Sequence, residues 1–297
     1  MAKVHVVCGG VSGEREVSLR SGAAIVAALK KAGHSVTTFD TTDPLIAIAA
    51  CDVVFPVLHG LGGEDGTLQA ELEANGIAFV GSGAEASRLC FDKQAYRDFL
   101  ITHKLPVASG EVVSKDTYAT HRLAKKPHVL KPITGGSSLD TYIIRDITQR
   151  DTEAINHTFD TYGVLLMEQL IVGTEITVGV LDTAALPIIE IIPPADGEFD
   201  YTNKYNGETQ ELCPPRSVTK SNQEIAQNLA LAIHQLTGCR DFSRTDMILS
   251  RNGTITVLET NTIPGLTAES LYPKMLAEYG LDLVQFVDER IKQALQR

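Results

Sequence analysis

Residues 244–261 have the sequence RTDMILSRNGTITVLETN, in which two β-rich runs flank an Asn-Gly pair. An Asn-Gly pair in that setting predicts a β-hairpin with a two-residue turn. Counting outward from the turn places Asp246 opposite Glu259 and Arg244 opposite Asn261. Side chains two residues apart on a strand point the same way, so all four are expected on one face of the sheet.

Asp246 and Glu259, facing each other, predict a divalent-cation site. Like charges directly opposite on a sheet are destabilising. Carboxylate and amide oxygens suit Mg²⁺, which usually also keeps a substrate phosphate as a ligand. For the hairpin alone, the alternative is a solvated strand pair whose charges are screened by salt.

The composition is that of a globular protein with an acidic surface. The chain has 297 residues, 43% of them hydrophobic and 21% charged, and a net charge of -11. This length accommodates two or three domains, and the acidity argues against nucleic-acid or membrane-surface partners. The five cysteines are scattered without a Cys-x-x-Cys pair, which indicates neither a disulfide framework nor a zinc site. No run reaches the ~18 apolar residues of a membrane helix, so we expect a cytoplasmic protein.

The first third of the chain alternates strand and helix patterns, which predicts a parallel sheet covered by helices. Strands are expected over residues 3–8, 35–39, 52–58 and 77–80, and helices over 16–32, 66–74 and 84–102. Two loops rich in small residues, 9–16 and 59–66, follow predicted strands. Ligand-binding loops lie at such strand ends in parallel sheets.

The middle of the chain predicts a smaller, mostly antiparallel α+β unit. Its expected strands span residues 111–114, 128–133, 141–145, 164–170 and 175–181. After the strand that holds Lys131, residues 134–138 have the sequence TGGSS. Such a turn either folds N–H groups over phosphates beside the lysine or is a plain hairpin loop.

The last third contains a long irregular stretch, 193–215, with Tyr201, Lys204 and Tyr205. Loops of this length usually bind or cover a ligand. Helices are expected over residues 217–236 and 281–295, and Ser270 stands near the start of a short helix, where a carboxylate could bind. The predicted fold therefore combines α/β and α+β regions.

Two other phosphate-binding patterns were compared with the chain. No Gly-x-x-x-x-Gly-Lys-Ser/Thr is present, which excludes a P-loop enzyme. Residues 81–86 partly match a dinucleotide fingerprint, but no acidic residue ends a following strand at the required distance. A nicotinamide oxidoreductase would also leave the metal hairpin without a purpose.

A series of motifs occurs in the order found in D-alanine–D-alanine ligases of the ATP-grasp superfamily: GGVSGEREVSLRSG, HGLGGEDGTLQAELE, VGSGAEAS followed by DK, KPITGGSS, MEQLIVGTEITV, DYTNKY, and RTD followed by LETNTIPGLTAESL. The chain resembles that family over nearly its whole length. The resemblance implies an N-terminal α/β substrate domain over 1–91, a central lid domain over 92–173, and a C-terminal domain over 174–297 that holds the metal site and the loop 193–215. Nucleotide would bind between the last two.

The activity implied is ATP-dependent ligation. ATP phosphorylates the carboxylate of one D-alanine, and the amine of a second attacks the acyl phosphate to give the dipeptide for peptidoglycan synthesis, with ADP and phosphate. The alternatives are a D-Ala–D-Ser ligase, another ATP-grasp carboxylate–amine ligase, and a nonenzymatic nucleotide-binding module. A homodimer is also implied.

The resemblance further implies roles for individual residues. Two Mg²⁺ ions, or Mn²⁺, would be bound by Asp246, Glu259 and Asn261. ATP would contact Lys93, Lys131, Glu168, Gln169, Ile171, Glu175 and Lys204. The amino acids would contact Glu14, His59, Arg244, Gly265, Ser270 and Leu271. Catalytic roles would fall to Glu14, Ser137, Tyr205, Arg244 and Gly265.

The chain departs from the family pattern at several positions. Leu139-Asp140 stands where Val-Gly is usual, Asp241 where Gly is usual, and Asn203 where Ala is common. Ser243 lies in the same altered segment as Asp241, just before Arg244. Losing glycines removes permissive backbone conformations, so we expect altered geometry in the lid and at the start of the metal hairpin.

Overall fold

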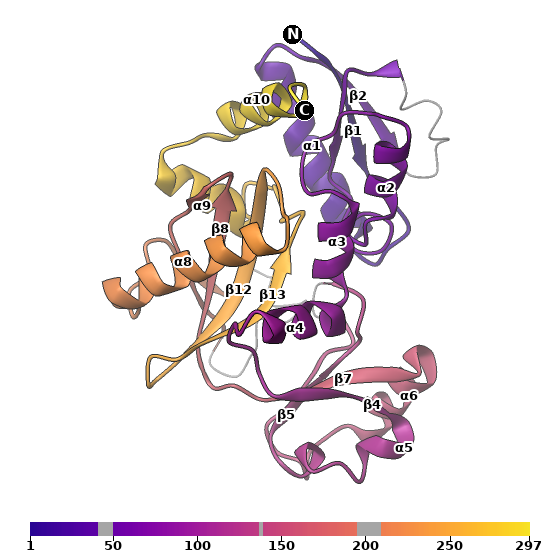
Figure 1. The fold of residues 1–297 in the computed structure, drawn as a ribbon, viewed down its shortest axis with the longest axis vertical. Coiled ribbons are helices and arrows are strands. Elements are labelled where there is room, and N and C mark those ends of the chain that lie inside the picture. The colour runs from indigo at the N-terminus through magenta and orange to yellow at the C-terminus, as the bar shows by residue number, and fades with distance from the viewer. Residues whose placement is uncertain (41–49, 137–138, 195–208) are drawn as a thin grey trace.

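Figure 1 shows the computed structural model of the chain, which describes residues 1–40, 50–136, 139–194 and 209–297. In these residues the strands form three sheets that follow one another along the sequence. The first sheet is parallel and the other two are antiparallel. This arrangement confirms the predicted combination of α/β and α+β regions.

The first sheet has the order β2-β1-β3 and consists of β1 (Lys3–Cys8), β2 (Ser35–Asp40) and β3 (Val53–Pro56). Helix α1 (Arg15–Lys31) packs on this sheet. The strand predicted over 77–80 is wrong, because this segment makes only one bridge, between Val54 and Phe79. Gly76 and Gly81, with φ of +62° and +100°, turn the chain on either side and leave no room for a longer strand.

Three helices follow: α2 (Thr67–Ala74), α3 (Ala84–Phe91) and α4 (Lys93–Thr102). A single helix over 84–102 was predicted, but Asp92 interrupts it with an extended backbone. Its carboxylate accepts hydrogen bonds from the N–H groups of Gln94 and Ala95 at 3.0 and 2.9 Å. Asp is a favoured N-cap residue, and here it starts a new helix.

The middle sheet has the order β4-β7-β5-β6. Its strands are β4 (Gly110–Ser114), β5 (His128–Lys131), β6 (Tyr142–Ile144) and β7 (Val164–Gln169), with the short helix α5 (Lys115–Tyr118) after β4. Helix α6 (Thr152–Tyr162) was not predicted; it packs on this sheet through Ile155 and Phe159. In Figure 1 these elements form the lower lobe.

The last sheet has the order β11-β10-β8-β12-β13, with β9 paired to β8. Its strands are β8 (Gly173–Leu181), β9 (Ala184–Ala185), β10 (Ile189–Ile192), β11 (Gln210–Leu212), β12 (Phe242–Ser250) and β13 (Ile255–Asn261). Helix α8 (Lys220–Leu236) packs on it. The prediction that residues 175–181 belong to the middle unit is therefore wrong, because β8 pairs along its whole length with β12.

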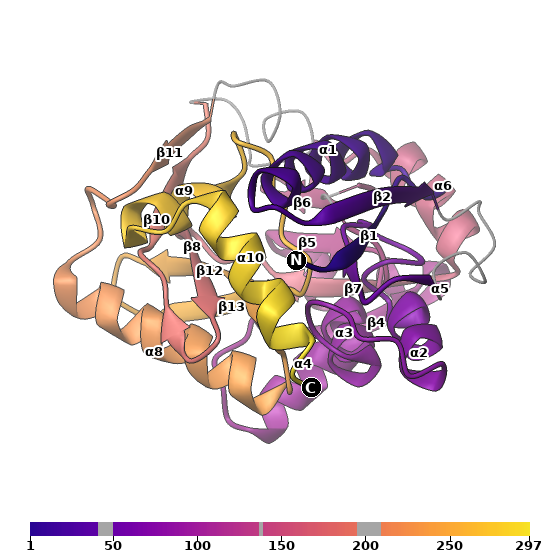
Figure 2. The same ribbon diagram turned by 90° about the horizontal axis from the view of Figure 1, so that it is seen from above.

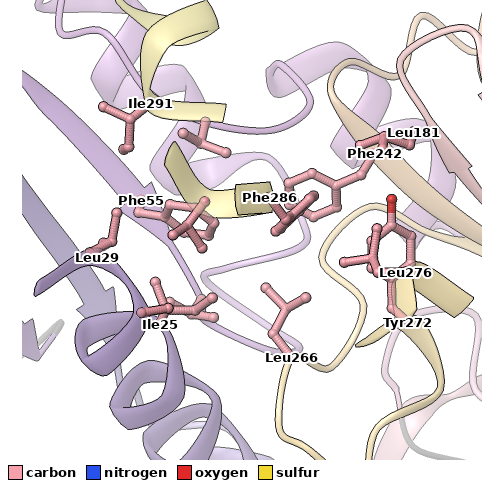
Figure 3. Packing of buried hydrophobic residues seen from close by; sticks show 14 of the residues in the cluster. Ile25, Leu29, Phe55, Leu181, Phe242, Leu266, Tyr272, Leu276, Phe286 and Ile291 are labelled. Carbon is pink, nitrogen blue, oxygen red and sulfur yellow. The ribbon is translucent and has the colours of Figure 1, made fainter. Parts of the chain in front are cut away.

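The largest hydrophobic core joins the first sheet to the end of the chain. Helices α9 (Leu271–Tyr279) and α10 (Leu283–Ala294) bring Tyr272 and Phe286 against Phe242 of β12, while Ile25 and Phe55 come from the first sheet and its helix (Figure 3). The Phe242 and Phe286 rings are 5.4 Å apart, edge to face. Seen from above, α10 lies between the first and last sheets (Figure 2). This core fixes the loops of the first sheet relative to β12 and β13.

The hairpin has the predicted partners at its far end and a different register near its turn. Arg244 pairs with Asn261 and Asp246 with Glu259, as predicted. Toward the turn, Leu249 rather than Ser250 lies opposite Ile255, and the register shifts by one residue beyond Asp246.

The turn explains the difference. Ser250 N–H donates to the Thr254 carbonyl at 2.9 Å, and Gly253 N–H donates to the Ser250 carbonyl at 2.9 Å. The loop therefore has three residues, 251–253, with Gly253 in the left-handed region at φ +85°. The prediction of a two-residue turn is wrong.

A β-bulge at Leu258 restores the predicted pairing at the far end. The bulge also has a packing role, because Ile255 and Val257 belong to the hydrophobic core under α8, whereas Glu259 and Asn261 line cavities. All four are odd-numbered, and an unbroken strand would place them on one face. The extra residue reverses the faces between Val257 and Glu259.

Candidate functional site

Two cavities meet at the far end of the hairpin. One, of about 630 Å³, lies between the middle and last sheets, and the other, of about 420 Å³, lies between the loops of the first sheet and the segment after β13. Four residues line both: Lys93, Gly135, Gly136 and Glu259. A group transferred between molecules in the two cavities would pass beside these residues.

The larger cavity gathers the residues predicted to contact ATP. Besides Lys93, it is lined by Lys131, Glu168, Gln169, Ile171 and Glu175. Lys131 Nζ lies 2.6 Å from Glu168 Oε2, and both side chains are largely buried. Burial lowers the pKa of Lys131, but the adjacent Glu168 carboxylate outweighs this effect, and the pKa is raised. The lysine is therefore held as a cation.

Lys93 starts α4 and lies where the two cavities meet. Its Nζ donates to the Gly135 carbonyl at 2.6 Å, which links α4 to the turn after β5. Burial, together with the positive charge of Lys131, lowers the pKa of Lys93, although the carboxylates of Glu259, Glu64 and Glu14 act in the opposite direction. The position and charge suit a phosphate that reaches the junction.

The smaller cavity gathers the residues predicted to contact amino acids: Glu14, His59, Arg244, Gly265, Ser270 and Leu271. They come from both predicted loops of the first sheet, from β12, from the segment between β13 and α9, and from the start of α9. Burial, together with the positive charge of Arg244, lowers the pKa of His59 to about 4. His59 is therefore neutral near pH 7.

Glu14 is buried, and its carboxylate lies between two loop glycines, Gly60 after β3 and Gly136 after β5. A Cβ at Gly136 would lie 2.5 Å from Glu14 Oε2, and one at Gly60 would lie 2.7 Å from the same oxygen. A side chain at Gly136 or Gly60 would therefore push the end of the Glu14 side chain aside, and Gly60 also has φ +74°, where glycine is favoured. The close approach places the carboxylate against the turn after β5.

Arg244 binds Asp246 through two hydrogen bonds. Its Nε and Nη2 atoms donate to the two carboxylate oxygens of Asp246 at 2.9 and 2.8 Å. Both residues are buried, and the neighbouring carboxylates raise the pKa of Arg244 despite that burial. Thr177 of β8, which the sequence did not indicate, donates from Oγ1 to Asp246 Oδ1 at 2.5 Å.

The predicted metal ligands lie side by side at the junction. Asp246 lines the larger cavity, Asn261 the smaller one, and Glu259 both. Two carboxylates and an amide oxygen are a donor set that suits Mg²⁺ completed by phosphate and water. Among the described residues, no group of three or more His, Cys, Asp and Glu side chains forms a separate metal site.

Glu64 is a buried residue of this site that the sequence analysis missed. With the Asn261 amide oriented to satisfy its neighbours, the Asn261 nitrogen donates to Glu64 Oε1 at 2.8 Å and its oxygen accepts from Arg244 at 2.9 Å. Gly60 N–H donates to Glu64 Oε2 at 2.7 Å. Burial and the nearby Glu14 carboxylate raise the pKa of Glu64 to about 8. In the sequence Glu64 lies in the loop 59–66 and in the motif HGLGGEDGTLQAELE, but no role was assigned to it.

The start of α9 forms one wall of the smaller cavity. Ser270 Oγ accepts from Thr267 N–H at 3.2 Å and lies 2.8 Å from Thr267 Oγ1. A Cβ at Gly265 would lie 2.8 Å from Ser270 Oγ, so a larger residue there would push the Ser270 hydroxyl aside. The predicted residues Ser137, Lys204 and Tyr205 lie outside the described residues.

Two departures from the family pattern keep a glycine-like backbone. Asp140 and Asp241 have φ of +54° and +62°, in the left-handed region that Asp tolerates better than most residues. Asp140 accepts a hydrogen bond from the Tyr162 hydroxyl at 2.7 Å. Asp241 Oδ2 accepts from Gly81 N–H at 2.6 Å and from Arg297 Nη2 at 2.9 Å. Each carboxylate thus has partners that glycine would lack.

Comparison with known proteins gives a consistent result. A family model described as D-ala D-ala ligase C-terminus matches residues 102–292, and one described as D-ala D-ala ligase N-terminus matches residues 39–82. The chain is 38% identical over 303 residues to the D-alanine--D-alanine ligase of Gluconobacter oxydans, covering 99% of this chain and 100% of that protein. It is 36% identical over 310 residues to the ligase of the same name from Desulfotalea psychrophila, covering 99% and 95%.

Solved structures of the same class are similar along the whole chain. The D-alanine--D-Alanine ligase of Bacillus anthracis complexed with ATP has a TM-score of 0.83 and 28% identity, covering 100% of this chain and 98% of that one. The VanG D-Ala:D-Ser ligase of Enterococcus faecalis has a TM-score of 0.82 and 27% identity, covering 98% and 99%. No helix in the described part of the chain combines the length and apolar composition needed to cross a membrane.

Proposed function

The chain belongs to the D-alanine–D-alanine ligase family, and we propose that it joins two D-alanine molecules at the expense of ATP. The observation that carries this proposal is the pair of cavities that share Lys93 and Glu259. ATP in the larger cavity transfers its γ-phosphate to the carboxylate of one D-alanine in the smaller cavity. The amine of a second D-alanine then attacks the acyl phosphate, and phosphate leaves.

The nucleotide is proposed to lie along the middle and last sheets. Lys131 and Lys93 are cations placed to bind phosphates, and Glu168, Gln169 and Ile171 line the wall expected to contact adenine. Glu175, at the start of β8, has a carboxylate suited to the ribose hydroxyls. Asp246, Glu259 and Asn261 would hold Mg²⁺, or Mn²⁺, which supplies charge neutralisation to the phosphates.

In the smaller cavity, Glu14 is proposed to bind the ammonium group of the first D-alanine. Arg244 and the Gly265 N–H are proposed to stabilise the oxyanion formed when the amine attacks. Ser270 and Leu271, at the start of α9, would receive the carboxylate of the second D-alanine. His59 is buried and neutral and would form the wall beside that substrate. Ser137, Lys204 and Tyr205 keep their predicted roles as part of this proposal.

The second amino acid is proposed to be D-alanine. A D-Ala:D-Ser ligase is nearly as similar in fold as a D-alanine--D-alanine ligase, so the fold does not separate the two. The relatives at 36–38% identity carry the D-alanine--D-alanine name, which supports D-alanine. We further propose three domains with the boundaries given above, a homodimer, and a place in the cytoplasm as a source of peptidoglycan precursor.

The deciding experiment measures ADP release by the purified protein with ATP and Mg²⁺, in the presence of D-alanine alone, L-alanine alone, or D-alanine together with D-serine or D-lactate. Mass spectrometry identifies the product. We expect D-alanyl-D-alanine with D-alanine alone and no product with L-alanine. ATP hydrolysis without any dipeptide would contradict the proposal, and a mixed D-alanyl-D-serine product would favour the second specificity.

A matched pair of variants tests the role of the hairpin. Arg244→Gln removes the buried guanidinium at the cavity, whereas Arg251→Gln changes an exposed arginine in the turn of the same hairpin. Loss of one oxyanion donor costs about 100- to 1000-fold in kcat. We expect that loss in the first variant and an unchanged rate in the second.

A further inference from the structure

Two of the scattered cysteines lie face to face. Cys90, near the end of α3, and Cys239, just before β12, are 149 residues apart, and their sulfur atoms are 4.0 Å apart. Both are free thiols, exposed by only 6% and 8%. They belong to one hydrophobic cluster together with Tyr96. The function proposed above uses neither of them.

The two thiols differ in their hydrogen bonds. Cys239 Sγ accepts from Thr237 Oγ1 at 3.3 Å and also faces the Cys90 thiol. The hydrogen bond from Cys90, followed by that from Thr237, lowers the pKa of Cys239 despite burial. The pKa of Cys90 is raised by the same contact and by burial. The Thr237 hydroxyl thus favours the thiolate form of Cys239, which can take up the Cys90 proton and leave the Cys90 sulfur as the nucleophile.

A small oxidant has a path to Cys90, the member of the pair that lines a cavity. Cys90 lines the smaller cavity, whose mouth admits amino-acid-sized molecules under the proposed function, and hydrogen peroxide is smaller than these. The juxtaposition and the access thus mark Cys90 and Cys239 as a reactive pair.

We propose that Cys90 and Cys239 form a reversible disulfide when the protein meets a peroxide. The Cys239 thiolate takes up the Cys90 proton across their contact, and the Cys90 sulfur attacks one peroxide oxygen; the O–O bond breaks, and the other oxygen leaves as hydroxide, which takes up a proton to become water. The Cys239 sulfur then attacks the resulting sulfenic sulfur of Cys90, and the S–O bond breaks to release a second water with the proton that Cys239 had taken up. The two thiols lose two electrons and the peroxide gains them.

Forming the bond must bring the sulfurs from 4.0 Å to about 2 Å apart. Cys90 lies three residues before Lys93, and Cys239 lies five residues before Arg244. The closure therefore pulls α3 toward the start of β12, on both sides of the cavity junction. Misplacement of a positioning group by ~1 Å costs up to about 100-fold in rate. We expect at least a tenfold, reversible loss of ADP release on that scale.

The test treats the full-length protein with hydrogen peroxide, alkylates the remaining thiols under denaturing conditions, and maps the peptides without reduction. The expected product is a Cys90–Cys239 cross-linked peptide, formed in parallel with the loss of activity and removed by a thiol reductant. Cys90→Ala should retain activity under the same peroxide, whereas Cys213→Ala, which removes a half-buried thiol elsewhere, should be inhibited like the wild type.

The peptide map does not depend on catalysis, so it separates this proposal from the proposed function. Cross-linking in a protein without ligase activity would support the thiol pair and contradict only the function. Oxidation of other cysteines without the Cys90–Cys239 peptide would overturn the proposal. Equal inhibition of Cys90→Ala and wild type would overturn the link to activity. If Cys90→Ala fails to fold, Cys90→Ser gives the same discrimination.

Discussion

Replacing Asp241 with glycine, the residue usual in the family, should destabilise this protein. At φ +62° an aspartate is strained by about 1 kcal/mol relative to glycine, and the substitution relieves that strain. Glycine also gains freedom in the unfolded chain, which costs roughly 0.5–1 kcal/mol. These two backbone effects nearly cancel, so the contacts of the carboxylate decide the sign.

Those contacts are a buried hydrogen bond from Gly81 N–H at 2.6 Å and an ion pair with Arg297 at 2.9 Å. A hydrogen bond to a charged group contributes about 1.5–3 kcal/mol. The Arg297 side chain is 33% exposed, so its pair is discounted to about 0.5–1 kcal/mol. Together they predict that Asp241→Gly lowers the free energy of unfolding by about 2–4 kcal/mol.

Urea unfolding of both proteins at pH 7 measures this difference. Asp140→Gly is the matched control, because Asp140 has φ +54° but its partner is the exposed Tyr162 hydroxyl. Its effect should stay within about 0.5 kcal/mol. An Asp241→Gly protein as stable as the wild type, or equal losses in both variants, would refute the reasoning.

Three further predictions concern the site and its surroundings. Thr177→Val removes the hydroxyl that donates to Asp246 at 2.5 Å. This variant should need about 10- to 100-fold more Mg²⁺ for half-maximal ADP release, whereas Thr177→Ser should not. An unchanged Mg²⁺ dependence would contradict this role. Burial lowers the pKa of His234 from 6.5 to about 4. Between those pH values only the unfolded chain binds the proton, so the free energy of unfolding falls by up to about 3 kcal/mol as pH decreases. His234→Gln should lose stability less steeply than wild type over that window in pH-dependent urea unfolding, and equal slopes would count against it. Gly136→Ala should displace the Glu14 carboxylate, which lies 2.5 Å from the new Cβ. It should therefore raise the KM for D-alanine more than the KM for ATP. Equal changes in both constants would argue against that contact.

Local patterns predicted those elements whose signals lie within the element itself. The strand over 3–8 and the helix over 281–295 appear within two residues of their predicted ends. Asp92 and Asp151 show what was overlooked, since each caps a helix with its own side chain, and Asp151 starts the helix that was missed. These caps were visible in the sequence as Asp before a helical segment.

The sequence predicted the residues of the candidate site that had a family role or a position set by strand spacing. It missed residues that only tertiary packing brings to the site. Glu64 contacts Asn261 across almost two hundred residues, and no local pattern relates them. The same holds for Thr177, whose partner Asp246 depends on the pairing of β8 with β12. The cysteine spacing likewise excluded a local motif without revealing that Cys90 faces Cys239.

The bulge at Leu258 couples the length of the turn to the orientation of the site. The core residues Ile255 and Val257 face the opposite side of the sheet from the site residues Glu259 and Asn261 because the bulge lies between the two pairs. A one-residue change in the loop 251–253 would therefore turn one of the two pairs to the wrong face. A compensating deletion or insertion at the bulge would restore both. A length change in the loop should therefore occur together with one at the bulge. A loop grafted from a relative should function only when the strand segment after it is exchanged as well.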